Sequence, residues 1–389
     1  MNLSHDNILR SFPKRPLNRG SYQKAVHLIN NDPKFLDSCR INFEWLDCYL
    51  ESHWIVSDSY ANVDALALES LSKTITGAKC LVFLHGLWPT QKQALDTLDP
   101  TLHTSIGFLW GGDYTSDAIP YHRLYSQQTR RLMQSMHPKG KYLPFLIFDT
   151  INILKNKLIL RKTRRNLMNY LNLLDFVVCG WGEAEFRFLP DNRTRLLPSF
   201  NPYYSCLKVN KSTTPKTSDK ETLRILIGNS GTQTNNHIDV IQSVRRYNPD
   251  VPFKFTVLLS YGDQAYIDRL ISCFKNDPSV DVVIDFLSVS DFNALIEEHD
   301  FLALGSRRQQ GSGFIRFAIS HEKPLILFKD SIAYAFFQEL DVDLMSFDAA
   351  FSSSTQSPEV LRAKFEFHQE LNIRHFQDLV ITLISQNHE

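Results

Sequence analysis

The sequence has 389 residues, of which 42 are basic and 42 acidic, so its formal net charge at pH 7 is zero. This balance excludes a protein that binds nucleic acid over a broad basic surface and leaves only local charged patches to consider. Hydrophobic residues make up 43% of the chain, enough for packed cores. A chain of this length suggests two domains of roughly 200 residues each.

The six cysteines are scattered, with no Cys-x-x-Cys pair. This pattern is typical of reduced thiols in a cytosolic protein and does not predict a zinc site. Residues 1–16 lack the apolar core of a secretory signal. No apolar run reaches the ~18–20 residues that a membrane-spanning helix needs. We therefore expect a cytosolic protein without a transmembrane helix.

The first half of the sequence gives irregular signals. Residues 1 to about 50 are polar and interrupted by prolines, and we predict no strand there. A short strand is predicted over 53–57, a helix over 63–72 and a buried strand over 80–84. The buried strand leads into His85-Gly86. This histidine could act as a base or bond a sugar hydroxyl, or it could be a structural histidine with satisfied hydrogen bonds.

The next apolar segment, 106–109, ends in Trp110-Gly111-Gly112-Asp113. The two glycines permit a sharp turn that could direct Asp113 into a cleft, and Trp110 offers a flat face for a sugar ring. A turn in which Asp113 caps a helix is an equally good interpretation. Asp113 is the first candidate for a general base, with His85 second, because deprotonating a hydroxyl requires a carboxylate or imidazole at hydrogen-bond distance.

A basic segment covers residues 155–165, with apolar residues between the charges. Its six basic residues are Lys155, Lys157, Arg161, Lys162, Arg164 and Arg165, and it contains no acidic residue. This composition suits a helix on an anionic lipid surface, where each cation adds on the order of 1 kcal/mol. A solvated helix face fits equally well, but the neutrality of the remaining chain favours the membrane surface.

Regular alternation of strands and helices begins after a further strand at 175–179 and a polar, turn-rich linker at 208–221. The predicted strands cover 223–227, 253–259, 280–286, 301–304 and 325–328, and the helices 238–247, 265–274, 290–298, 314–321 and 332–340. This repetition indicates a parallel sheet covered by helices on both faces.

Two glycine-bearing loops each join a predicted strand to a predicted helix in this half. They read Gly228-Asn229-Ser230-Gly231 and Arg308-Gln309-Gln310-Gly311-Ser312-Gly313. The glycines let the backbone approach a phosphate, Asn229, Ser230, Gln309 and Gln310 add hydrogen-bond donors, and Arg308 can bind two phosphate oxygens. Either loop alone could be an ordinary connection. Together they predict a binding site for a nucleotide diphosphate.

These features predict an α/β protein of the GT-B type, with two Rossmann-like domains facing across a cleft. The expected domains are 1–207 and 222–389, joined by the linker 208–221. No Asp-x-Asp follows a strand, so we expect no metal cofactor. Arg308 and the helix dipoles would instead offset the charge that develops on a leaving diphosphate.

Several motifs resemble those of glycosyltransferase family 56. They are 225–231 with Asn235 and His237-Ile238, Arg308 to Gly313, His85-Gly86, Trp110 to Asp113, and Tyr261 with Ala265-Tyr266-Ile267. The basic segment is also similar to a basic helix of the family. Two departures are Gly112, where the family has alanine, and the absence of a recognisable strand in residues 1–50.

The resemblance implies transfer of N-acetylfucosamine from its dTDP form to an undecaprenyl-diphosphate-linked glycan in the assembly of enterobacterial common antigen. It implies an acceptor-binding first domain and a donor-binding second domain. It also implies a peripheral protein at the cytoplasmic face of the bacterial inner membrane. A transferase for another sugar or acceptor, a sugar-nucleotide epimerase or hydrolase, and a binding module without chemistry remain alternatives.

Overall fold

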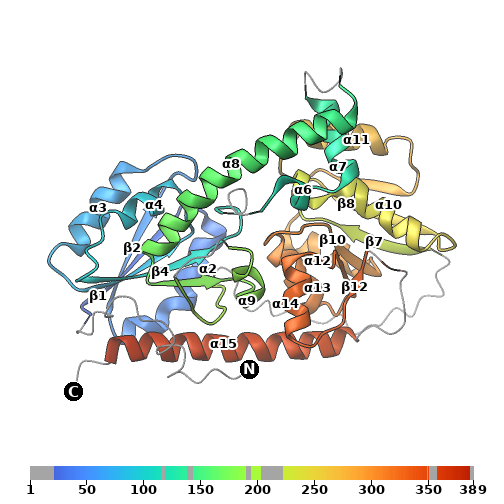
Figure 1. Ribbon diagram of the computed structural model, residues 1–389. Helices are drawn as coiled ribbons and strands as arrows, with labels where there is room; N and C mark the ends of the chain where they lie inside the picture. The colour runs from blue at the N-terminus through green and yellow to red at the C-terminus, as the bar shows by residue number, and fades with distance from the viewer. Residues whose placement is uncertain are drawn as a thin grey trace. The chain divides into compact units, whose positions relative to one another are not determined.

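The computed structural model describes residues 22–114, 119–137, 143–189, 194–202, 222–347, 349 and 357–385. The predicted linker over 208–221 lies outside the described residues. The chain forms two compact units (Figure 1). The first contains residues 1–118, 163–205 and 367–389, and the second contains 119–162 and 206–366.

The first unit is built on a parallel sheet with the strand order β2-β1-β3-β4-β5-β6. Its strands are β1 (Lys24–Asn30), β2 (Glu51–Ser57), β3 (Cys80–His85), β4 (His103–Leu109), β5 (Phe176–Cys179) and β6 (Arg195–Leu196). Its shorter helices are α2 (Pro33–Phe43), η1 (Glu44–Cys48), α3 (Ala65–Ile75), α4 (Pro89–Leu95) and α9 (Gly182–Phe186). β2 pairs with one side of β1 and β3 pairs with the other. The strand order therefore has a switch point between β1 and β3, although all the strands are parallel.

Strand β1 corrects the expectation that residues 1–50 hold no strand. Its segment Lys-Ala-Val-His-Leu-Ile-Asn has polar residues at both ends and a histidine in the middle, which weakened the apolar signal. In the structure His27 is fully buried and stacks on the Trp54 and Phe83 rings, with centroids 4.0 and 4.6 Å away. The burial of this histidine depends on residues distant in sequence, which a local pattern does not contain.

The second unit has a parallel sheet with the order β12-β11-β10-β7-β8-β9. Its strands are β7 (Leu223–Ile227), β8 (Phe253–Leu258), β9 (Val280–Val283), β10 (Phe301–Leu304), β11 (Leu325–Leu327) and β12 (Met345–Ser346). The intervening helices are η3 (Gln233–Asn235), α10 (His237–Tyr247), α11 (Gln264–Phe274), α12 (Val289–Glu297), α13 (Ser312–Ser320) and α14 (Ile332–Glu339). The predicted alternation is therefore confirmed, with shifts at the element ends.

In the second sheet the switch point of the strand order lies between β7 and β10. From β7 the chain continues to β8 and β9 on one side, and β10 then pairs with the other side of β7. In open α/β sheets, ligands bind outside the carboxyl ends of the strands at such a switch point. The two glycine loops follow β7 and β10, so both lie at this point.

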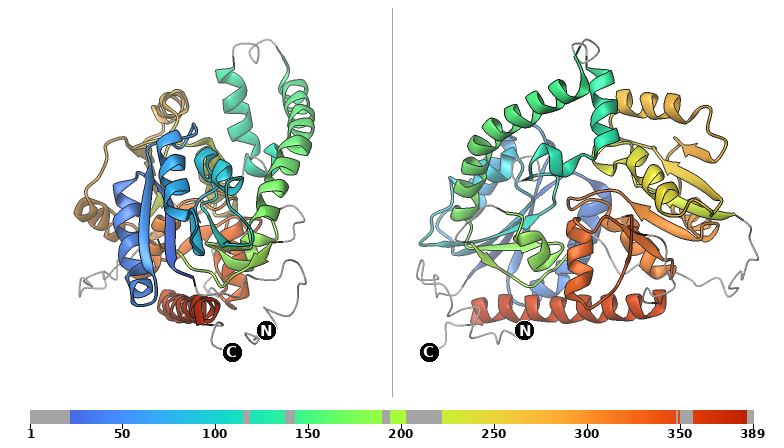
Figure 2. Two further views of the ribbon diagram at one scale, coloured as in Figure 1. Left: turned by 90° about the vertical axis from the view of Figure 1, so that its left-hand side faces the viewer. Right: turned by 45° about the vertical axis from the view of Figure 1, so that its right-hand side comes forward.

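A helical hairpin made by α7 (Gln127–Met136) and the first part of α8 (Phe145–Leu173) also belongs to the second unit (Figure 2). Short α6 (Tyr121–Leu124) precedes it. The Asp239 carboxylate on α10 accepts hydrogen bonds from the Gln128 and Thr129 amides and from the Thr129 hydroxyl, at 2.7–2.8 Å. A carboxylate at a helix N-terminus is favoured by the exposed amides and the helix dipole, so Asp239 fastens α7 to α10.

Two long helices make the units differ from the expected continuous domains. Residues 145–162 of α8 belong to the second unit and the remainder to the first. In α15 (Pro358–Ser385) the residues from 367 onward belong to the first unit, where Phe376, Leu379 and Val380 are buried in its core. Among the described residues, no helix combines the length and apolar character that crossing a bilayer requires.

Candidate functional site

The two glycine loops of the second unit touch each other at the carboxyl edge of its sheet. We call residues 228–236 the first glycine loop and residues 305–313 the second. A Cβ on Gly305 would lie 2.1 Å from the backbone oxygen of Asn235, and one on Gly311 would lie 3.4 Å from Asn229 Cγ. The loops therefore pack together, and Gly305 is required because the first loop lies directly on its backbone.

Side chains also bond the two loops to each other. Gln310 Nε2 donates to Thr232 Oγ1 at 2.8 Å, while its Oε1 accepts from Thr234 Oγ1 at 2.5 Å. Gln310 was expected to donate to a phosphate. Both ends of its amide bond the first loop, so Gln310 joins the two loops, and its contact with a phosphate stays a prediction.

Gly231 also differs from the expectation that its backbone contacts a phosphate. Its N–H donates to the Tyr261 carbonyl at 2.6 Å and its carbonyl accepts from the Asp263 N–H at 3.1 Å. A Cβ here would lie 2.2 Å from Ile267 Cγ1. The glycine is needed for this close packing on the loop after β8. Gly228, with φ of +78°, does adopt the left-handed backbone that its residue type permits.

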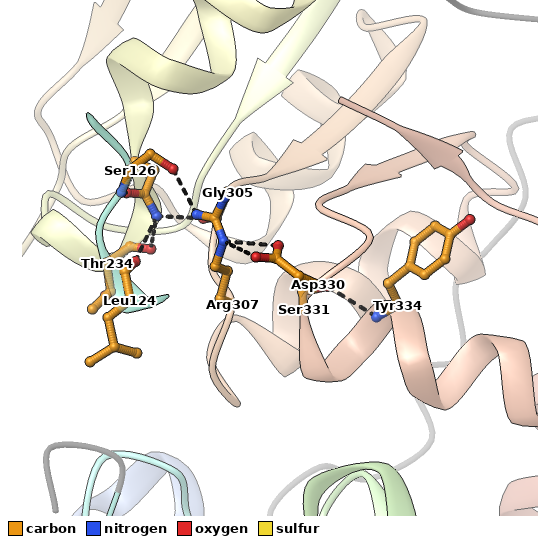
Figure 3. A network of polar contacts seen from close by, with 9 residues as sticks. Leu124, Ser126, Thr234, Gly305, Arg307, Asp330, Ser331 and Tyr334 are labelled. Carbon is orange, nitrogen blue, oxygen red and sulfur yellow. Dashed lines mark hydrogen bonds and ion pairs between the residues drawn. The ribbon is translucent and has the colours of Figure 1, made fainter. Parts of the chain in front are cut away.

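Asn236, which the sequence did not single out, connects three segments of the second unit, and its partners Leu124, Ser126, Thr234 and Gly305 are labelled in Figure 3. Its side-chain nitrogen donates to the carbonyls of Gly305, Thr234 and Leu124 at 2.8, 2.9 and 3.1 Å, and its oxygen accepts from the Ser126 N–H at 2.7 Å. It is fully buried, with φ of +50°. Asparagine is the non-glycine residue most at ease in this backbone region, so the paired Asn-Asn before the helix was the available signal.

The two adjacent arginines of the second loop have different surroundings. Arg307 Nε donates to both Asp330 carboxylate oxygens at 2.8 Å, and its Nη1 donates to Ser126 Oγ at 2.7 Å (Figure 3). Its guanidinium carbon lies 3.9 Å from the Phe328 ring centroid. Arg307 therefore supports the loop. Arg308, the predicted anion ligand, is half-buried. Burial raises the pKa of Tyr125, and the charge of Arg308 partly opposes that rise.

Three amide oxygens in these loops are buried without a hydrogen-bond partner. They belong to Asn229, Asn235 and Gln309. Buried polar groups in native proteins are nearly always paired, so groups left unpaired at a loop junction call for a ligand or water. His237 beside Gly228 is fully buried, and burial lowers its pKa to about 3, so it is neutral here. The helices α10 and α13 begin at this place without a side-chain cap at Asn236 or Gly311.

In the first unit, Asp113 lies at the carboxyl edge of the sheet in the loop after β4. Its Oδ2 accepts from the Leu87 N–H at 2.7 Å and its Oδ1 from the Trp110 N–H at 3.1 Å. Burial raises the pKa of Asp113 to about 6, although these backbone donors act to lower it. Each carboxylate oxygen retains a second lone pair, so the group can still accept a proton.

His85 lies inside the first core rather than at a solvent-facing edge. It is fully buried, its Nε2 is 3.1 Å from His27 Nδ1, and its ring stacks on Phe108 with centroids 5.1 Å apart. Burial lowers the pKa of His85 to about 3. A base must reach its substrate, so this environment removes the reason for treating His85 as the second candidate base.

Glu185, which the sequence did not single out, is a second buried acid in the first unit. Its Oε1 accepts from the Tyr114 hydroxyl at 2.5 Å and its Oε2 from the Trp181 N–H at 3.0 Å. Burial, with a smaller contribution from the nearby charge of Asp113, raises the pKa of Glu185 to about 8. The segment Gly-Trp-Gly-Glu-Ala-Glu after a strand gave no indication that the carboxyl group of its second glutamate, Glu185, would be enclosed.

The basic segment lies on α8, where its six basic side chains are exposed. Large apolar side chains on the same helix are exposed as well: Leu146, Ile147, Ile151, Leu154, Leu158 and Ile159. Residues 147, 151, 154 and 158 follow the three- and four-residue spacing of one helix face. We call these exposed residues from 146 to 165 the apolar–basic face.

With this geometry established, comparison with known proteins identifies the family. Residues 188–378 match the profile of 4-alpha-L-fucosyltransferase, glycosyl transferase group 56. The chain carries a glycosyltransferase family 56 domain. The matched region includes both glycine loops, so the resemblance read from the sequence is confirmed. This family domain supports a glycosyltransferase.

Solved structures show what the whole glycosyltransferase resembles in fold. Anabaena HepE in complex with UDP-glucose has a TM-score of 0.50 and 13% identity, over 94% of this chain and 100% of that one. A trehalose 6-phosphate synthase from Burkholderia multivorans has a TM-score of 0.49 and 7% identity, over 95% and 94%. The glycosyltransferase has the expected α/β fold of the GT-B type, with two Rossmann-like units. No curated protein sequence matches it significantly.

Proposed function

We propose that this glycosyltransferase moves N-acetylfucosamine from a dTDP-linked donor to an undecaprenyl-diphosphate-linked glycan, in a cell-surface polysaccharide pathway such as that of enterobacterial common antigen. The family described as a 4-alpha-L-fucosyltransferase supports a 6-deoxyhexose donor. The observation that carries the proposal is the junction of the two glycine loops at the switch point of the second sheet.

The donor diphosphate would bind at this junction. Asn229, Ser230, Gln309 and Arg308 supply side chains, while Gly311 and Gly313 lie at the uncapped start of α13. Helix N-termini attract anions because their first amides lack partners and the dipole is positive there. The buried amide oxygens can turn their NH₂ groups toward a phosphate or accept from a sugar hydroxyl.

The reaction needs a base on the acceptor side and charge stabilisation on the donor side. The acceptor hydroxyl oxygen attacks the anomeric carbon, the bond between that carbon and the diphosphate oxygen breaks, and the hydroxyl proton passes to a base. Asp113 is the proposed base, since its raised pKa of about 6 still leaves it mainly ionised at neutral pH. Arg308 and the helix N-termini would stabilise the departing dTDP without a divalent metal.

We further propose that the apolar–basic face of α8 binds an anionic membrane surface at the cytoplasmic side of the inner membrane. Leu146 and Leu158 expose 75% and 68% of their area, and the six basic residues follow or lie between such apolar positions. An amphipathic helix of this kind places apolar side chains below the headgroups and cations beside anionic lipids. This arrangement would bring the enzyme to a lipid-linked acceptor.

The test of donor and acceptor combines binding with turnover. dTDP-, UDP- and GDP-sugars are compared by thermal shift, because a donor that binds only the folded protein raises its melting temperature. The best donor is then incubated with undecaprenyl-diphosphate-linked glycan, with and without EDTA. The proposal expects dTDP-N-acetylfucosamine to give the largest shift and a product unaffected by EDTA. Release of free sugar at the same rate without acceptor would contradict transfer.

Membrane binding is tested by sedimentation with vesicles. Wild-type protein should bind vesicles containing 30% phosphatidylglycerol, while Leu154→Ser/Leu158→Ser and Arg161→Ser/Arg165→Ser should each bind several-fold less. A matched control is Arg245→Ser/Arg246→Ser on α10, which removes two exposed cations elsewhere. Equal binding by all variants would contradict the proposed face.

A further inference from the structure

The switch point of the first sheet is surrounded by aromatic side chains. The first turn of α2, which follows β1, contributes Phe35, and the loops after β2, β3 and β4 contribute Tyr60, Trp88 and Trp110; we call these four residues the aromatic cluster. The Tyr60 and Trp88 centroids are 5.0 Å apart, those of Phe35 and Trp110 are 5.0 Å apart, and those of Trp88 and Trp110 are 6.5 Å apart. Four segments that follow separate strands therefore bring aromatic rings to the place where open α/β sheets bind ligands.

The aromatic cluster is neither core nor free surface. All four residues are half-buried, whereas the side chains beneath them in β3 and β4 are buried. The rings meet edge to face or at a tilt, with interplanar angles of 85° for Tyr60 and Trp88 and 54° for Tyr60 and Trp110. Rings arranged in this way leave part of their faces uncovered, and aromatic surface at a sheet edge is typical of ligand sites.

Local backbone features fix the cluster in place. Gly86 has φ of +100°, and a Cβ there would lie 2.4 Å from Trp88 Nε1, so only glycine lets the indole lie against this turn. The Asp113 carboxylate bonds the backbone amides of Leu87 and Trp110 and thereby joins the loops after β3 and β4. A site held in this way loses little conformational entropy when a ligand binds.

Two polar atoms on these rings distinguish between possible ligands. The Tyr60 hydroxyl and Trp88 Nε1 are buried and have no hydrogen-bond partner. An isoprenoid chain would cover the rings and leave both groups unsatisfied, at a cost in free energy. Burial and, to a smaller extent, the negative charge of Asp32 raise the pKa of Tyr60 to about 12. A phosphate bound here would be repelled by the same Asp32 carboxylate, so a phosphate is disfavoured. A pyranose ring offers apolar C–H faces to the rings and hydroxyls to both polar atoms.

We propose that Tyr60, Trp88 and Trp110 bind a pyranose ring of the acceptor glycan, with Phe35 supporting Trp110. This inference rests on the proposed function, because the acceptor is the second carbohydrate that the transfer requires. The hydroxyl of Tyr60 and the N–H of Trp88 bond sugar hydroxyls, and the ring faces cover its C–H face. The site recognises the sugar portion of the acceptor, and its lipid portion lies elsewhere.

Steady-state kinetics of Trp88→Leu and Tyr60→Phe with the glycan-linked acceptor test the inference. The expected result is an acceptor KM raised about tenfold or more for Trp88→Leu and about threefold to tenfold for Tyr60→Phe, since one hydrogen bond changes affinity by this order. The donor KM should stay within twofold of the wild type. Unchanged acceptor KM values, or equal increases for donor and acceptor, would overturn the inference.

The control variants are Trp45→Leu and Tyr49→Phe. Trp45 is on η1 and Tyr49 follows it, so both precede β2 at the amino edge of the sheet, and their acceptor KM values should match the wild type. Melting temperatures establish that each variant folds. Tyr60→Phe removes a single oxygen, so it keeps the test valid even if Trp88→Leu does not fold.

Two further arms separate the possible outcomes. Undecaprenyl diphosphate without sugar should compete poorly with the acceptor, and competition that is strong in the wild type and lost in Trp88→Leu would show a lipid site instead. The dTDP-induced thermal shift of the wild type is measured in parallel. If that shift is absent, the proposed function fails. If it is present while the acceptor KM ignores Tyr60 and Trp88, only the present inference fails.

Discussion

The two units share one architecture but differ in what their loops place at the switch point. Both sheets are parallel, six-stranded and reverse direction beside their first strand. In the second unit the loops there are rich in glycine, amides and arginine. In the first unit the equivalent segments carry the aromatic cluster and the buried carboxyl group of Asp113, and Glu185 follows on α9 after β5.

This difference shows that the fold fixes where a ligand binds and the loop residues fix which ligand it is. Amides, a cation and helix N-termini suit a diphosphate, because they provide donors and positive potential. Aromatic rings with single polar atoms suit a sugar ring, and a raised carboxyl pKa suits a base. We call the switch-point edge of the second sheet the polar edge and that of the first sheet the aromatic edge. The following variants test the difference between the two edges.

Removing the positive charge of Arg308 from the polar edge should have the largest effect on activity. Arg308→Ala should lower kcat/KM by about 10²–10³-fold, because charge developing on the diphosphate loses its partner. Arg246→Ala, which removes an exposed cation on α10, is the matched control and should act like the wild type. Steady-state assays with varied donor measure both. Near-normal activity of Arg308→Ala would remove Arg308 from the donor site.

Changes at Asn236 should weaken the contact between the two glycine loops most. Asn236→Ala should lower the free energy of unfolding by about 3 kcal/mol, since it leaves buried backbone groups of Gly305, Leu124 and Ser126 without partners. Asn236→Gly keeps the positive φ at no steric cost and should lose less. Urea denaturation measures the difference. Equal loss in both would mean that the lost hydrogen bonds, and not backbone strain, govern the stability of this site.

The aromatic edge should make stability depend on pH through Glu185. Its pKa is about 8 in the folded protein against an ordinary value of 4.5, so between these values the folded state binds more protons than the unfolded state. The free energy of unfolding should therefore fall as pH rises, by about 2 kcal/mol from pH 5.5 to 7. Glu185→Gln should flatten this slope. A variant with an unchanged slope would show that another group causes it.

The smallest expected effect is the fall of kcat/KM at acid pH, the acid limb of the pH–rate profile. With a pKa of about 6, Asp113 loses its ability to accept a proton as pH falls below that value. kcat/KM should therefore drop about tenfold between pH 7 and 5, and Asp113→Asn should be inactive yet folded. Glu185 is already protonated in this pH range because its pKa is about 8, so Glu185→Gln should leave the limb where it is. A wild-type rate that stays flat to pH 5 would exclude Asp113 as the base.

The sequence predicted the polar edge far better than the aromatic one. In the second half, apolar strands alternate with amphipathic helices, so local periodicity located most elements and both glycine loops. It could not show that Gln310 and Gly231 are used within the protein, because their partners Thr234 and Tyr261 come from other loops. In the first half, β1 contains a histidine whose burial depends on Trp54 and Phe83.

The aromatic cluster shows the same limit. Phe35, Tyr60, Trp88 and Trp110 are separated by 22 residues or more, and no two of them form a motif. Only the strand order β2-β1-β3-β4 brings their loops together. The sequence indicated Trp110 and Asp113 as single candidate residues. It could not show which side chains surround them, because that depends on the order of the strands in the sheet.

Hydrogen exchange with bound ligands tests the contrast between the two edges most directly. Adding dTDP should slow exchange in residues 228–236 and 305–313, while the glycan portion of the acceptor should slow exchange in the loops that hold Tyr60, Trp88 and Trp110. Protection by dTDP that avoids both glycine loops, or that falls on the aromatic cluster instead, would contradict the account.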